Sequence, residues 1–159
     1  MKFPKKVYTE KEVEKAKKLI NEGYKHELRV QGTPEFKNKV NQALELLRIS
    51  KYFDLVSTYI KEIIEIDGLT QLRETEAVIW ANKFAVENPV DAASLFVQKT
   101  NHMKEYIEGK EYYGGQAEKR SVEKRIQFLE VLKKESKDKA IKNECKRLLQ
   151  MWEEASLAY

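Results

Sequence analysis

Cysteine, histidine, proline and glycine are all scarce in this chain. Among 159 residues there are one cysteine, two histidines, three prolines and six glycines. A single cysteine cannot form an internal disulfide, which is typical of a reducing compartment, so we expect a cytoplasmic protein. One cysteine with two histidines is also too small a ligand set for a structural zinc site.

Long apolar segments are absent as well. No apolar run approaches the roughly 20 residues that a membrane helix needs, so we expect no membrane partner. Residues 1–6 carry charge but no apolar segment of the kind found in secretory signals. Apolar residues make up 42% of the chain, which argues against wholesale disorder. The length predicts a single domain over residues 1–159, with residues 1–8 as a flexible N-terminus.

Charge, in contrast, is abundant, because Asp, Glu, Lys and Arg make up 35% of the chain. Abundant lysine and glutamate with little Cys, Gly and Pro is typical of proteins from thermophiles. The net charge is +4, and it is unevenly spread. Residues 51–109 carry six bases and ten acids, whereas residues 110–150 carry twelve bases and seven acids. Because acids and bases are interleaved, we favour a solvated, salt-bridged helical surface.

Helical periodicity prevails along the chain. Residues 9–12 have the form of a capping box, and Gly23 is placed to end the helix that follows. Asn88-Pro89 begins a helix that is apolar almost all round from Val90 to Val97, so it is the best candidate for a central buried element. It should end at Gly109. The other expected helices start at Thr33 and Tyr52, contain Val122–Leu132, and contain Ile141–Trp152.

Short strands are expected between these helices. Residues 24–30 alternate between apolar and polar side chains, which predicts a strand. Residues 52–66 show a helical period of polar side chains, so we expect a helix that passes into a strand near residues 64–66. For residues 76–87 a strand is slightly favoured over a short helix. The expected fold is α+β, dominated by about six helices with a few short strands, and the alternative is an all-α bundle.

No complete catalytic motif is present. Gly114-Gly115 lacks the Lys-Ser/Thr continuation of a phosphate-binding loop, and there is no Gly-x-Ser-x-Gly elbow. Cys145 lies on the apolar stripe of its helix, so we expect a core residue and not a nucleophile. The neighbouring carboxylates Glu62 and Glu65 are expected on a solvated face.

One arrangement around the central helix is more specific. That helix carries the pentapeptide from Gln98 to His102, and Glu118 comes early in the next helix. This pattern resembles the gluzincins, zinc metallopeptidases in which a buried helix carries His-Glu-x-x-His and a later helix supplies a glutamate ligand. The resemblance covers roughly residues 34–130. His102 matches the second histidine and Glu118 the third ligand, whereas Gln98 replaces the first histidine and Lys99 replaces the catalytic glutamate.

These departures imply a zincin-like fold that has lost its peptidase chemistry. Glutamine is a weak zinc ligand. A protonated lysine cannot accept the proton of the attacking water, and its positive charge repels a nearby cation. We therefore expect a non-enzymatic binding or interaction domain with no cofactor. One alternative is an atypical metal-dependent hydrolase that holds zinc with His102 and Glu118. In the plainest interpretation, His102 only packs beside Met103, and Glu118 is favoured by its place in the first turn of a helix.

A third hypothesis assigns nucleic-acid binding to the basic region 110–150. Basic side chains share one helix there, and two tyrosines upstream could stack on bases. Interleaved glutamates dilute the positive potential and no reader motif is present, so a protein partner is favoured over nucleic acid. The residues concerned are Lys119, Arg120, Lys124, Tyr112 and Tyr113, with Arg125 in the same basic stretch.

Overall fold

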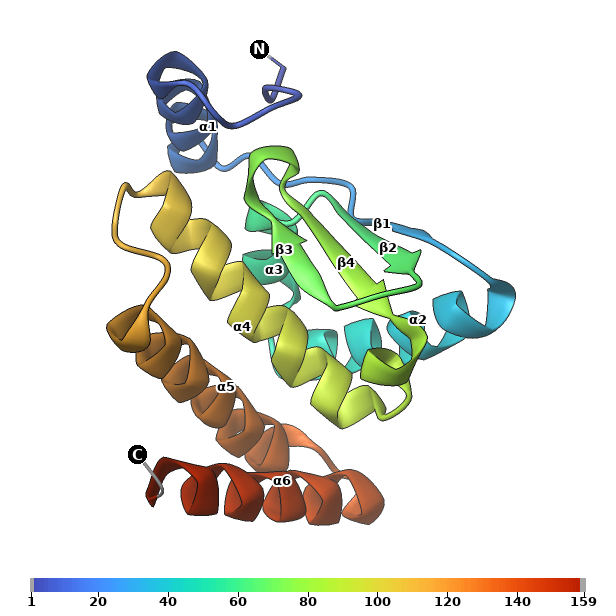
Figure 1. The fold of residues 1–159 in the computed structure, drawn as a ribbon. Coiled ribbons are helices and arrows are strands. Elements are labelled where there is room, and N and C mark those ends of the chain that lie inside the picture. The colour runs from blue at the N-terminus through green and yellow to red at the C-terminus, as the bar shows by residue number, and fades with distance from the viewer. Residues whose placement is uncertain (1, 158–159) are drawn as a thin grey trace.

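The protein combines helices with one small sheet (Figure 1). The structure is a computed structural model that describes the backbone of residues 2–157 and the side chains of residues 2–155. In chain order the elements are α1 Glu10–Asn21, β1 Arg29–Gln31, α2 Pro34–Ile49, α3 Phe53–Tyr59, β2 Glu62–Ile66, β3 Gln71–Arg73, the 3₁₀ turn η1 Glu74–Glu76, β4 Val78–Asn82, the 3₁₀ turn η2 Lys83–Val86, α4 Pro89–Ile107, α5 Gly115–Glu135 and α6 Lys139–Leu157.

The sheet has the strand order β1-β2-β4-β3. Strands β1, β2 and β4 run parallel, with Ile63 opposite Ile79, and β3 pairs with β4 in the antiparallel sense at the edge. Parallel pairs need crossover connections: α2 and α3 lie between β1 and β2, and the edge strand β3 with η1 lies between β2 and β4. The α+β prediction is therefore confirmed, and the all-α alternative is wrong.

The core lies between one face of the sheet and the helices. Ile63, Ile79 and Ala81 are fully buried on that face, and they belong to one apolar cluster with Phe36 of α2 and Phe96 of α4. Helix α4 also packs against α2, α3 and α5, so it is the central helix that its apolar composition predicts. Figure 1 shows α5 and α6 on the far side of α4 from the sheet.

Local capping signals set the helix starts. Thr9 and Glu12 form a reciprocal capping box, and Thr33 accepts a hydrogen bond from the backbone N–H of Phe36. The Asn88 side chain accepts hydrogen bonds from the first-turn amides of α4. Gly109, with a positive φ of 74°, follows the end of that helix, as its position in the sequence predicts.

Two expected elements differ in the structure. Of the segment 24–30 only residues 29 and 30 form a strand, together with Gln31, because Tyr24 and His26 pack with Phe3 instead of pairing in the sheet. The helix expected from residue 52 ends at Tyr59, and the strand expected near residues 64–66 begins earlier, at Glu62. Pairing with the strands on either side overrides the helical period of these residues.

The N-terminal segment, for which flexibility is expected, contacts the rest of the domain at Val7. This side chain is fully buried, and its backbone N–H donates to the carbonyl oxygen of Thr75 at 2.7 Å. The Tyr106 hydroxyl donates to the carbonyl oxygen of Val7. Thr75 of η1 and Tyr106 near the end of α4 thus anchor the segment.

The apolar stripe of α5 is fully buried at Leu129 and Leu132, and polar residues join the inner face nearer the start of the helix. Val122 is only half-buried, whereas Ser121, Arg125 and Phe128 are buried. Cys145 on α6 is fully buried, as its place on an apolar stripe predicts. Among the described residues, no helix is long and apolar enough to cross a membrane.

Candidate functional site

Two polar stripes face each other where α4 packs on α5. Each stripe has residues at the spacing i, i+3 and i+7, which places them on one side of a helix. The stripe on α4 consists of Asp91, Ser94 and Gln98, and the stripe on α5 consists of Glu118, Ser121 and Arg125. Hydrogen bonds join the two stripes along this part of the interface.

Arg125 is the centre of this network. Its Nη2 donates to Asp91 Oδ1 at 2.7 Å, and its Nε donates to Ser94 Oγ at 2.8 Å. The guanidinium carbon lies 4.7 Å from the centre of the Trp152 ring, which brings α6 into the same cluster. Burial lowers the pKa of Arg125, and the neighbouring Asp91 carboxylate opposes that effect. A fixed positive charge is therefore held between α4 and α5 by one carboxylate and several neutral acceptors.

Gln98 has its hydrogen-bonding groups engaged within the same network. Its Oε1 accepts from Arg125 Nη1 at 2.8 Å. Its Nε2 donates to Ser121 Oγ at 3.2 Å and lies 3.4 Å from Glu118 Oε1. The structure thus brings two of the positions suggested by the gluzincin pattern side by side, as an amide and a carboxylate in direct contact.

Lys99 and His102 lie next to this network on α4, and both are half-buried. Burial lowers the pKa of Lys99, and Arg125 adds to this, whereas the Glu118 and Glu74 carboxylates raise it. Burial, followed by the charge of Lys99, likewise lowers the pKa of His102, so the neutral imidazole is favoured. The Nε2 atom of His102 is buried and has no hydrogen-bond partner among the described residues.

Carboxylates from separate elements raise the pKa of Lys99 or of His102, and for His102 the Glu105 carboxylate of α4 is one of them. Glu118 is exposed in the first turn of α5, and Glu74 lies in η1 at the end of the edge strand β3. Both influence the pKa values of Lys99 and His102. Within the described part of the chain, no group of three or more His, Cys, Asp or Glu side chains could hold a metal ion.

The basic side chains predicted as nucleic-acid contacts are not equivalent. Arg120 is engaged within the protein, because its Nη2 lies 2.8 Å from Glu105 Oε2 and also donates to the carbonyl oxygen of Glu111. Since Glu105 is buried, this ion pair fastens α5 to α4. Lys119 and Lys124, in contrast, are exposed. The structure therefore leaves two of these three bases available to a partner.

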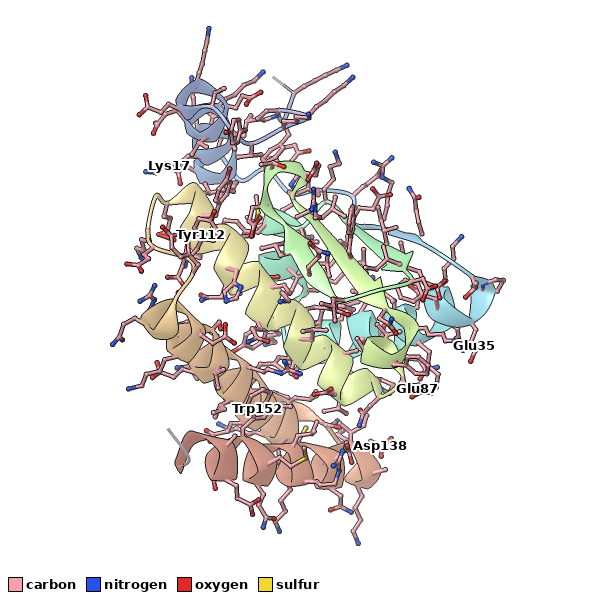
Figure 2. All side chains as sticks on the ribbon, in the orientation of Figure 1. Lys17, Glu35, Glu87, Tyr112, Asp138 and Trp152 are labelled. Atoms are coloured by element: carbon pink, nitrogen blue, oxygen red, sulfur yellow. The ribbon has the colours of Figure 1, made fainter. Side chains whose placement is uncertain are left out.

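Tyr112 lies in the connection between α4 and α5 (Figure 2), within a group of three tyrosines. The Tyr112 ring packs edge-on against Tyr106 with centroids 5.1 Å apart, and Tyr113 packs edge-on against Tyr112. Tyr113 is 68% exposed. Burial raises the pKa of Tyr106 and of Tyr112, and the charge of Glu74 contributes to both shifts. The charge of Glu74 thus acts on this aromatic group as well as on Lys99 and His102.

Reasoning from the sequence missed the role of Arg125. It counts Arg125 as one more base on a solvated helix, whereas the structure buries the guanidinium. A signal was present in the sequence: Asp91 and Ser94 interrupt the apolar stretch from Val90 to Val97, and Gln98 continues their helical spacing. The matching spacing of Ser121 and Arg125 on the next helix could have indicated a polar helix–helix interface.

No protein-family model, curated protein or solved structure matches this chain.

Proposed function

We propose that this chain is a non-enzymatic binding domain on a zincin-like scaffold. One observation carries the proposal: the Arg125 guanidinium donates to the Oε1 atom of Gln98 at 2.8 Å. Gln98 stands at a metal-ligand position of the gluzincin pattern, and that oxygen is the only atom of its side chain able to ligate a metal. The group that a metal would need is therefore occupied by a fixed positive charge, which repels a cation.

The order of the elements supports the scaffold. A helix, a strand-containing segment, the buried helix α4 and then α5 with Glu118 in its first turn follow each other as the resemblance implies. Gln98 Nε2 lies 3.4 Å from Glu118 Oε1. This contact fits two former metal-ligand positions that are now joined by a hydrogen bond instead of a metal.

The absence of a general base supports the loss of catalysis. Metal-assisted peptide hydrolysis needs a carboxylate that takes a proton from the attacking water. Lys99 stands at that place in the pattern. Burial lowers the pKa of Lys99, but whenever its amine is protonated it carries a positive charge. That charge would lie beside the position of the metal cation and repel it. The charges of Glu118 and Glu74 raise the pKa of Lys99, so they favour its protonated form.

A protein is the favoured partner. Tyr112 and Tyr113 present aromatic rings with polar ends, a type of side chain enriched in protein interfaces. The engagement of Arg120 with Glu105 weakens the basic surface that a nucleic acid would need. We place the binding surface at the α4–α5 connection, next to His102.

Hydrolysis of a peptide mixture by the pure chain, with zinc added, tests the loss of catalysis. We expect no cleavage above the rate of the buffer. Cleavage that disappears in both His102→Ala and Glu118→Gln, but persists in Glu123→Gln, would establish the metal-dependent hydrolase instead. Glu123 is an exposed acid on the same helix, so its variant makes the same charge change away from the site.

Site-specific photocrosslinking tests the binding surface. A photoreactive side chain replaces Tyr113 in one variant and Phe84 in the other, because both residues are 68% exposed. We expect defined protein adducts from the first variant, and we expect the unmodified chain to compete for them. Identical adducts from both positions, or none from position 113, would refute the assignment of this surface.

A further inference from the structure

A basic pocket opens at the other end of the molecule, between α1 and the N-terminal segment. Its volume is about 490 Å³, within the range of small-molecule sites. None of the residues of the α4–α5 network lines it. The pocket is lined by Pro4, Lys5, Lys6, Lys11, Glu12 and Lys15.

The charge of this pocket is strongly unbalanced. Four lysines and one glutamate line it, and none of these lysines forms a salt bridge with a described residue. The wider segment 2–18 has seven lysines and three glutamates, a net charge of +4 that equals the net charge of the whole chain. Positive charge is denser here than in residues 110–150, whose twelve bases and seven acids give +5 over 41 residues. This end of the protein therefore attracts anions.

Glu12 does little to neutralise the pocket. Its Oε1 accepts hydrogen bonds from the backbone N–H groups of Thr9 and Tyr8, as part of the capping box of α1. The hydrogen bond from the Thr9 backbone lowers the pKa of Glu12, and the charge of Lys6 adds to this. The carboxylate is thus turned toward the backbone, while the lysine ammonium groups remain available to a ligand.

Both walls of the pocket are fixed before any ligand binds. Val7 anchors the N-terminal wall through its burial and its hydrogen bond to Thr75. Phe3 holds the other end of that wall, with its ring stacked on Tyr24 at a centroid distance of 5.2 Å. Lys11 and Lys15 lie one turn apart on α1, so they form the opposite wall. A ligand then has little backbone to order, which favours binding.

We propose that this pocket binds a compact polyphosphate, a chain of two or more linked phosphate groups. Several negative charges within a small volume match four ammonium groups around one concavity. Lysine acts as a point charge on phosphate, whereas planar carboxylate recognition favours the arginine fork, and no arginine lines the pocket. Among the described residues no aromatic side chain lines the pocket either, so none of them offers a ring for stacking on a nucleobase.

Titration calorimetry with sodium tripolyphosphate, on the full chain at fixed ionic strength, tests the proposal. One variant replaces the four pocket lysines with glutamine. The matched control replaces four exposed lysines around the α5–α6 turn, which makes the same change in net charge. The control positions are Lys133, Lys134, Lys137 and Lys139.

The pocket variant is expected to weaken tripolyphosphate binding by about tenfold or more, which corresponds to about 1.4 kcal/mol or more, and the control is expected to leave it nearly unchanged. Equal losses in the two variants, or no binding by the wild type, would overturn the proposal. Adenosine triphosphate should bind as tightly as tripolyphosphate. Tighter binding of adenosine triphosphate would confirm an anion site in this pocket but overturn the choice of polyphosphate, because its ligand would then be a nucleotide. Single-stranded DNA that binds more tightly than either, with affinity rising with its length, would replace the proposal with a nucleic-acid surface.

Discussion

Replacing Arg125 with methionine tests whether the network between α4 and α5 holds this part of the fold together. The variant keeps an unbranched side chain but leaves the buried Gln98 oxygen without its donor and Asp91 without its ion-pair partner. Removing one partner of a buried ion pair costs about 3–5 kcal/mol. The Asp91 side chain is 39% exposed, so water compensates in part. We therefore expect the free energy of unfolding to fall by about 2–4 kcal/mol.

Urea unfolding followed by circular dichroism measures this change, and the dependence on urea concentration should stay the same. In a chain of this length the midpoint of thermal unfolding should fall by about 5–15 °C. Lys25→Met is the control, because Lys25 pairs with Asp54 at 3.5 Å on the surface and should contribute less than about 1 kcal/mol. An Arg125→Met variant that loses no more stability than this control would refute the role given to the network.

Three further predictions concern other sites. Acidification from pH 7 to pH 4 should lower the free energy of unfolding by up to about 3 kcal/mol. The reason is that burial lowers the pKa of His26 from 6.5 to about 4, so on acidification the unfolded chain is protonated at His26 before the folded chain is. The same pH series on His26→Phe should lack this loss. Gly32→Ala should lower the free energy of unfolding in urea by about 1–3 kcal/mol, because the new Cβ would lie 2.7 Å from Phe36 Cδ1. At Gly115 a new Cβ meets nothing within 4 Å, so Gly115→Ala should leave the stability unchanged. Burial raises the pKa of Cys145 to about 11, so a thiol reagent should label it only after unfolding, and rapid labelling of the native protein would contradict its burial.

The helix starts could be predicted because their signals are local. Thr9, Thr33 and Asn88 each cap the helix that follows through their own side chains. The strands depend on partners far away in the chain, and their prediction was weaker. Residues 62–66 have a helical period of polar side chains but lie between two parallel strands. Residues 24–26 alternate like a strand but pack with Phe3, a contact that the local pattern does not contain.

The candidate site shows the same division. The resemblance places Gln98, His102 and Glu118 at the three ligand positions. Gln98 Nε2 lies 3.4 Å from Glu118 Oε1, whereas His102 Nε2 has no hydrogen-bond partner among the described residues. The burial of Arg125 depends on acceptors that α4 supplies across a helix–helix interface, so its own neighbours in the sequence give no sign of it. The basic pocket could not be predicted from the sequence either, because residues 4–6 and α1 form it together only in the folded chain, where Val7 is anchored to Thr75.

The most direct test of the central claim is the zinc content of the untagged protein, purified without chelator from zinc-supplemented medium and measured by elemental mass spectrometry. A triple variant, Gln98→His with Lys99→Glu and Arg125→Met, is measured beside it, after circular dichroism confirms its fold. If Arg125 and its neighbours exclude a metal from a zincin-like site, the wild type holds only traces of zinc and the variant gains it. Near-stoichiometric zinc in the wild type, lost in His102→Ala and in Glu118→Gln, would contradict the account.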